Sequence, residues 1–225
     1  MVEWIMNLLV VVPAALFSIT IHEISHGYVA YLLGDPSPYL AKRLTLNPIR
    51  HIDPLGLLVL VLTRTFGWAR PVPINPANFR NIKAGIFLVS LSGPLSNFTM
   101  AVILTFVFKL LLKFHPPLLF DVYNYLVNGC MDLSAFKERL LLPIGIMIFV
   151  AIIINLSLAI FNLIPILPLD GGRILWSILP GPIASGYEKM EPFGLIIVVL
   201  LLFFFHLPKY IGIVIFKVVN LLFSI

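Results

Sequence analysis

The stretch WIMNLLVVVPAALFSITIHEISHGYVAYLL, residues 4–33, decides the fold class of this chain. Its first eighteen residues, Trp4 to Ile21, carry no charge, and a membrane-spanning helix needs about 20 mostly apolar residues. We expect one helix from Trp4 to about Leu33, where Gly34-Asp35-Pro36 ends it. The chain start lacks the basic region of a signal peptide, so this helix is expected to remain as a span.

Three further apolar runs, at 84–112, 140–163 and 193–225, extend the pattern. The 225 residues are 60% hydrophobic and 11% charged, against roughly 45–50% and about 25% in ordinary soluble domains. The mean hydropathy is +1.05. This composition excludes a soluble globular protein and a disordered chain. We predict an all-α polytopic membrane protein with about 4–6 transmembrane helices. It forms a single domain over 1–225, with a core at 4–180.

The connections between the runs have a different composition. Residues 34–83 contain seven prolines that separate short apolar pieces such as 57–62. We expect a short membrane-associated β-hairpin or re-entrant loop here, with 57–62 as its edge strand. Residues 113–139 form a mixed polar loop with room for a short amphipathic helix. The C-terminal apolar segment 193–225 is interrupted at His206 and is either one broken span or two short segments.

The basic residues of the loops predict an orientation, because lysine and arginine in short loops favour the cytoplasmic side. Loop 34–83 has seven of them, whereas loop 113–139 has three, matched by three acidic residues. The seven are Lys42, Arg43, Arg50, Arg64, Arg70, Arg80 and Lys83. We therefore expect the N-terminus outside and loop 34–83 in the cytoplasm. The net charge of +5 follows from this topology, since the sequence has no signature of nucleic-acid binding.

The first helix carries the pattern His22-Glu23-Ile24-Ser25-His26 near its end. Four residues advance a helix by about 400°, so the two imidazoles lie one turn apart on one face and suit chelation of one Zn²⁺. Glu23 is rotated by about 100° from His22 and stands beside the metal rather than on it. That is the place of a general base that takes a proton from a water at the metal.

A pattern with three fixed positions also arises by chance. Ionisable side chains in an apolar span, however, cost at least about 2.5–3.5 kcal/mol each, so three of them within five residues need a compensating partner such as a metal. The single cysteine, Cys130, excludes an internal disulfide and a thiolate-rich site. Histidine and carboxylate must therefore supply the ligands of any metal.

A catalytic zinc takes three protein ligands and keeps one position open, so a third ligand is needed. Asp170 stands in an apolar, proline-broken stretch at the end of a span, whereas the other free acidic residues lie in terminal or loop segments. His22 lies about 27 Å from Trp4 along the helix, near the inner limit of an about 30 Å core. The third span reaches its inner end near Leu163. We expect Asp170 to meet the histidines there, at the start of a new helix, where an N-cap role is compatible with ligation.

Three motifs follow one another along the chain: His22-Glu-Ile-Ser-His26, Ser92-Gly-Pro-Leu-Ser-Asn97 and Asn162-Leu-Ile-Pro-Ile-Leu-Pro-Leu-Asp-Gly171. Together they resemble the site-2 protease family of intramembrane zinc metalloproteases. The stretch Leu44-Thr-Leu-Asn-Pro-Ile-Arg-His-Ile-Asp-Pro54 is similar to its prokaryotic members. The resemblance implies one zinc per chain, held by His22, His26 and Asp170, with Glu23 catalytic. It indicates a minimal member, because no loop is long enough for an inserted PDZ-like or nucleotide-binding domain.

The resemblance further implies hydrolysis of peptide bonds in or next to a transmembrane segment of a membrane-protein substrate, within the lipid bilayer of a prokaryotic cell. It suggests that Asn162 and Asn97 contact the substrate or the oxyanion. An interhelical hydrogen bond is the alternative, which we favour for Asn97 and leave open for Asn162. The competing function is a non-catalytic metal-dependent membrane protein, either a transporter or an inactive scaffold. Glu23 favours the enzyme, because hydrolysis needs an unligated base.

Overall fold

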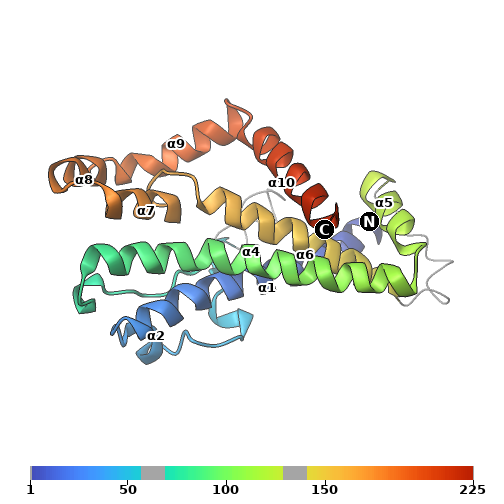
Figure 1. Cartoon of the computed structure of the whole chain (residues 1–225), viewed down its shortest axis with the longest axis horizontal. Helices are drawn as coiled ribbons and strands as arrows, with labels where there is room; N and C mark the ends of the chain where they lie inside the picture. The colour runs from blue at the N-terminus through green and yellow to red at the C-terminus, as the bar shows by residue number, and fades with distance from the viewer. Residues whose placement is uncertain (1, 57–68, 129–140, 225) are drawn as a thin grey trace.

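The computed structural model describes residues 2–56, 69–128 and 141–224, and these ranges fold almost entirely into helices (Figure 1). Four of the described helices are long and apolar enough to cross a membrane, at Leu9–Leu32, Ile82–Phe114, Leu142–Asn162 and Leu207–Ser224. The predicted all-α polytopic architecture is confirmed, with four candidate spans among the described residues.

Helix α4 (Ile82–Phe114) is the centre of the bundle. It packs against α1 (Val2–Leu32), α6 (Leu141–Asn162) and α7 (Asp170–Ile178), and Figure 1 shows it running along the long axis of the molecule between α1 and α6. Its first turn is capped by the side chain of Asn81, which accepts a hydrogen bond from the backbone N–H of Ala84. Helices α1 and α6 also pack against each other, so the three long helices form one packed unit.

The helices begin and end near the start and stop signals of the sequence. Helix α1 ends at Leu32, and Gly34 takes a φ of 101°, a left-handed conformation that favours glycine. Helix α7 begins at Asp170, where the new helix was expected. Helix α5 (Leu118–Asn128) is the short helix predicted for the loop 113–139.

The apolar core lies in the half of the bundle away from the end of α1. Phe108, Ile146 and Leu156 are completely buried there, and α5 and α10 (Leu207–Ser224) pack around them. The C-terminal run is divided into two helices, the shorter apolar helix α9 (Glu191–Phe203) and α10, and of these two α10 is long enough to be a candidate span. The packed half fixes the bundle and leaves the end near Asp170 available for a site.

The predicted β-hairpin after α1 is not found among the described residues. They contain the short helices α2 (Ser37–Leu40), η1 (Pro48–Arg50) and η2 (Pro76–Asn78), with a single antiparallel bridge between Ile52 and Ala69. Proline has no N–H to donate to a strand ladder, and all seven prolines of the loop lie among these described residues. The piece 57–62, to which the edge strand was assigned, lies outside the described residues.

Asp35 fastens the start of this loop to its end. The carboxylate is completely buried and accepts hydrogen bonds from the backbone N–H and hydroxyl of Ser37, from the backbone N–H of Asn75 and from the side-chain amide of Asn78. Burial raises the pKa of a carboxyl, but here the hydrogen bonds outweigh it and hold the pKa of Asp35 below its ordinary value. Asp35 thereby holds the ends of the loop together beside α1.

Replacing Asp35 by alanine is expected to lower the midpoint of thermal unfolding in detergent by about 5–10 °C, because four donors lose a charged acceptor. The lowered pKa means that the carboxylate stabilises the fold fully above its unfolded pKa of about 3.9 and loses this effect as the pH falls through its folded value. Asp53→Ala is the control, since among the described residues Asp53 accepts from two backbone N–H groups of its own turn. Equal midpoints for the two variants at pH 7 would contradict the assignment.

Candidate metal centre

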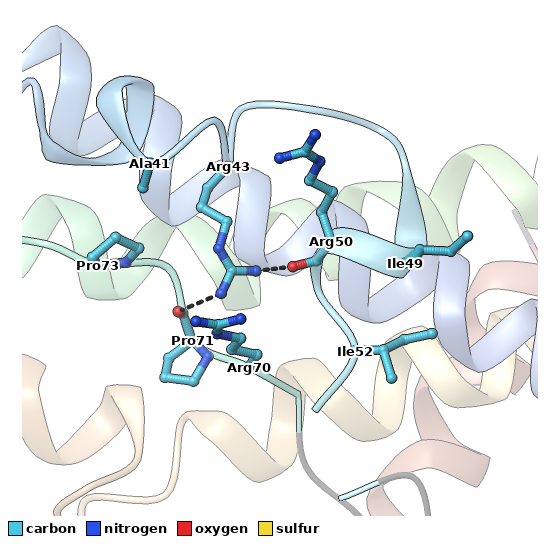
Figure 2. Close-up of a pocket in the computed structure, with 8 residues that line it drawn as sticks. All are labelled: Ala41, Arg43, Ile49, Arg50, Ile52, Arg70, Pro71 and Pro73. Carbon is cyan, nitrogen blue, oxygen red and sulfur yellow. Dashed lines mark hydrogen bonds between the residues drawn. The ribbon is translucent and has the colours of Figure 1, made fainter. Parts of the chain in front are cut away.

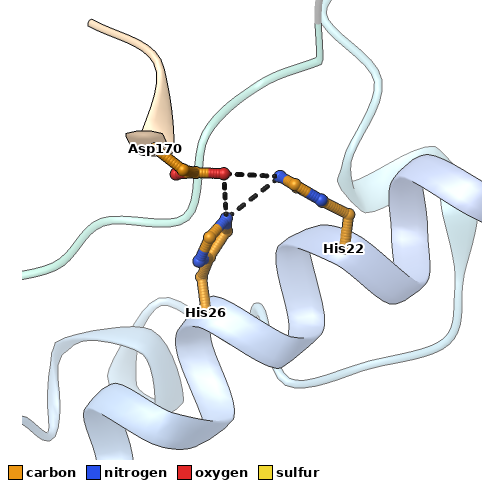
Figure 3. Close-up of side chains that lie close together, drawn as sticks. All are labelled: His22, His26 and Asp170. Carbon is orange, nitrogen blue, oxygen red and sulfur yellow. Dashed lines mark hydrogen bonds and ion pairs between the residues drawn. The ribbon is translucent and has the colours of Figure 1, made fainter. Parts of the chain in front are cut away.

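His22, His26 and Asp170 converge on one point, as Figure 3 shows. The two Nε2 atoms lie 3.0 Å apart, and Asp170 Oδ2 lies 3.2 Å from Nε2 of His22 and 3.3 Å from Nε2 of His26. Both histidines are only 7% exposed. The structure thus brings together the three residues that the sequence singled out, although 144 positions separate His26 from Asp170.

The aspartate reaches the histidines because the start of α7 packs tightly against the segment before it. A Cβ on Gly171 would collide with the carbonyl oxygen of Leu163, and a Cβ on Gly172 would collide with the backbone of Leu167. Glycine at these two positions permits the close approach. The pair therefore explains why Asp170 is followed by Gly-Gly, and the helix N-terminus that results favours the negative charge of Asp170.

The second nitrogen of each imidazole fixes the protonation pattern of the site. His22 Nδ1 lies 2.6 Å from Asn97 Oδ1, and His26 Nδ1 lies 2.7 Å from the carbonyl oxygen of Val89. Both partners are acceptors, so each Nδ1 carries the proton and donates it. In the neutral imidazoles the two Nε2 atoms then hold lone pairs that face each other.

These observations meet the requirements of a metal site. The two Nε2 atoms and the buried Asp170 Oδ2, which accepts no hydrogen bond from the described residues, converge as three candidate ligand atoms. Ligands at about 2.0–2.1 Å from a tetrahedral zinc are separated by about 3.3 Å, close to the three distances observed. The residues present therefore fit a zinc ion with three protein ligands and one open position.

Asn97 belongs to a buried polar network that joins three helices. Its Nδ2 donates to the carbonyl oxygen of Ser18 on α1 and to Oδ1 of Asn155 on α6, at 3.1 and 2.7 Å. Asn155 in turn donates to the Ser18 hydroxyl and to the Ala151 carbonyl. All polar atoms of the Asn97 amide are thus used, and the residue is completely buried. This places Asn97 behind His22 as a positioning residue, away from the space a substrate would occupy.

Sequence analysis missed Asn155 and Ser18. Both interrupt apolar stretches of predicted spans, where an unpaired polar side chain is costly in lipid, and this is the signal that would have found them. Asn162 does line the cavity beside the candidate ligands, and its Nδ2 donates to Leu158 of the same helix.

A cavity of about 420 Å³ opens at the candidate ligands. Glu23 lines it, and the Glu23 carboxylate accepts a hydrogen bond of 2.9 Å from the backbone N–H of Val72. The donor is a backbone group of the proline-rich loop, so no side-chain pattern in the sequence predicted this hydrogen bond. Glu23 lies beside the three candidate ligands in the same cavity and is not part of their cluster, as the helical spacing predicted.

Comparison with known proteins points in the same direction as this geometry. The model of the family described as Peptidase family M50 matches residues 79–205. A Bacillus subtilis (strain 168) protein named "Putative zinc metalloprotease YwhC" is 39% identical over 194 residues, which cover 86% of this chain and 80% of that protein. A Mycolicibacterium smegmatis (strain ATCC 700084 / mc(2)155) protein named "Putative zinc metalloprotease Rip2" is 30% identical over 100 residues, 43% of this chain and 38% of that protein. No solved structure matches the chain.

The chain therefore belongs to peptidase family M50, the site-2 proteases, and is a membrane zinc metalloprotease of that type. This membership decides against the transporter or inactive scaffold considered from the sequence. The matched range includes Asn97 and Asp170 but begins after His22, Glu23 and His26. The assignment of individual roles to the residues of α1 accordingly depends on the geometry described above.

Asn97→Leu is expected to weaken zinc binding by about 10- to 100-fold, because His22 loses the partner that fixes its tautomer and ring orientation. Zinc retained after dialysis against a competing chelator measures the effect. Thr99→Val is the matched control, since Thr99 lies on the same helix, is exposed, and among the described residues bonds to Leu95 of its own helix. Wild-type zinc retention in Asn97→Leu would show that Asn97 does not position His22.

Proposed function

We propose that this protease hydrolyses peptide bonds in or next to a transmembrane segment of a membrane-protein substrate, with zinc held by His22, His26 and Asp170 and with Glu23 as general base. The observation that carries the proposal is the convergence of His22, His26 and Asp170 in a cavity that the Glu23 side chain also lines. The single-domain organisation over 1–225 is part of this proposal.

When bound, zinc supplies a Lewis acid that lowers the pKa of a water molecule to about 7 and polarises a carbonyl. Glu23 takes the proton of the attacking water as its oxygen bonds to the carbonyl carbon of the scissile peptide. As the C–N bond breaks, Glu23 gives this proton to the departing amine. The N–H of Val72 holds the carboxylate in place for both transfers.

The charges of the site suit a low-dielectric location. The Asp170 and Glu23 carboxylates together carry two negative charges, which balance the two positive charges of one zinc ion, while both histidines stay neutral. Near-neutrality lowers the cost of keeping the centre inside an apolar bundle. No basic side chain other than that of Arg173 lines the cavity among the described residues.

The cavity walls support an apolar peptide as substrate. Val72, Ile74, Phe79 and Ile86 line it together with the candidate ligands, and Asn162 adds an amide to its lining. In a helix the backbone carbonyls are occupied by hydrogen bonds, so a transmembrane substrate must unwind locally to enter. Asn162 is suited to bind the freed substrate backbone or the oxyanion.

Glu23→Gln is expected to reduce cleavage of a reconstituted single-span substrate by at least 10³-fold while zinc content stays near one ion per chain, because the amide cannot accept the proton. His22→Ala combined with Asp170→Ala should remove the zinc. Metal analysis and gel-based cleavage are measured on the same samples. Loss of zinc from Glu23→Gln, with cleavage retained, would make Glu23 a ligand and contradict the proposed roles.

We also propose that the N-terminus lies outside and that loop 34–83 is cytoplasmic, which opens the site toward the cytoplasm. Ala77 on this loop and Tyr123 on α5 are both exposed, so cysteine at either position is accessible from its own side of the membrane.

On a Cys130→Ser background, Tyr123→Cys is expected to react with an impermeant thiol reagent applied to intact cells, and Ala77→Cys only after permeabilisation. Labelling intensity before and after permeabilisation is compared on gels. The reverse pattern would invert the topology and leave the metal site unaffected.

A further inference from the structure

A second pocket, of about 350 Å³, lies in the loop between α1 and α4 (Figure 2). Three arginines line it, Arg43, Arg50 and Arg70, together with the apolar side chains of Ile49, Ile52 and Pro71. We call it the arginine pocket. It contains none of the candidate zinc ligands, although Pro71 borders both cavities.

Arg43 forms the floor of the arginine pocket. Arg43 is only 7% exposed. Its guanidinium donates to the carbonyl oxygens of Arg50 and Pro71, as the dashed lines in Figure 2 show. A guanidinium has five N–H donors, so these two bonds leave three for another acceptor. The side chain is held in place by the backbone, which makes it a preorganised anion receptor.

Three arginines and no carboxylate of the described residues line the arginine pocket. None of their carboxylates forms an ion pair with Arg43, Arg50 or Arg70. Burial, and next the positive charge of Arg70, lower the pKa of Arg43 from its ordinary value, while the Glu23 carboxylate, which forms no ion pair with Arg43, acts in the opposite direction. Figure 2 shows the Arg70 side chain beside that of Arg43, with Arg50 extending toward the rim. A buried cation beside a second cation calls for an anion.

The surroundings of the pocket indicate where this anion comes from. Four large apolar side chains of the same loop are strongly exposed, namely Leu40, Leu46, Ile49 and Leu55 at 66–74%. Ile49 also lines the pocket. Exposed apolar side chains around a cationic pocket in a membrane protein match the boundary of a bilayer, where acyl chains and phosphate groups lie next to each other.

We propose that the arginine pocket binds the phosphate group of an anionic phospholipid at the membrane surface. Arg43 and Arg70 contact the phosphate oxygens, bidentate contacts being favoured by the planar guanidinium. Arg50 contributes from the rim, and the exposed apolar side chains contact the start of the acyl chains. This site is independent of the proposed catalytic roles.

Binding is tested on the full-length protein in detergent by native mass spectrometry during titration with phosphatidylglycerol. Wild-type protein is expected to retain one phosphatidylglycerol per chain, and Arg50→Gln and Arg70→Gln are each expected to weaken its binding by roughly fivefold. Arg80→Gln removes the same charge from the same loop outside the pocket, so it should bind like wild type. Arg50 and Arg70 are replaced because both are exposed, whereas Arg43 is buried and bonds to two backbone carbonyls, so that its replacement would destabilise the fold.

Two further titrations test whether the pocket requires the net negative charge of the lipid and whether it distinguishes a lipid from free phosphate. Phosphatidylcholine, which has a phosphate but no net charge, and inorganic phosphate are each titrated in place of phosphatidylglycerol. Binding at least tenfold weaker for both supports the proposal. Inorganic phosphate that binds as tightly as phosphatidylglycerol would assign the pocket to a free anion and overturn the lipid assignment. Equal weakening by Arg80→Gln would overturn the pocket itself in favour of diffuse charge attraction.

Discussion

The hydrogen bonds at the two imidazole Nδ1 atoms are the constraint on which the candidate metal centre depends. Because Asn97 and the Val89 carbonyl accept these protons, the Nε2 atoms of His22 and His26 are left as electron-pair donors facing Asp170. Both acceptors belong to α4. The central position of this helix in the bundle is thus also a chemical requirement, since α4 fixes the state of ligands that α1 supplies.

Much of this arrangement was predictable from residue types and spacing. The uncharged run before His22 indicated a span, the four-residue spacing of the histidines indicated one face of a helix, and the isolated position of Asp170 indicated a third ligand. The role of Asn97 was predictable only as an interhelical bond, because its partner depends on the rotation of α4 against α1. The contact between Val72 and Glu23 was not predictable, since a backbone N–H leaves no mark in the sequence. The predicted hairpin has no support among the described residues, which form a single antiparallel bridge between Ile52 and Ala69.

The proline-rich loop serves as a shared wall between two chemically different cavities. Pro71 borders both of them and accepts a hydrogen bond from Arg43, while the next residue, Val72, donates to Glu23. Proline on either side of Val72 restricts the backbone of this short segment and leaves it one N–H. This short segment can therefore hold the Glu23 carboxylate in place without belonging to a strand, because the N–H of Val72 is donated to it.

The hydrogen-bond acceptors of the two histidines differ in whether a single substitution can remove them. The acceptor of His26 is a main-chain carbonyl, which every amino acid at position 89 would retain, whereas the acceptor of His22 is the side-chain amide of Asn97. A single codon change at position 97 removes that acceptor, while no codon change at position 89 deletes the other. Relatives that keep the fold but lose the chemistry should therefore carry their differences at the position of Asn97 more often than at that of Val89.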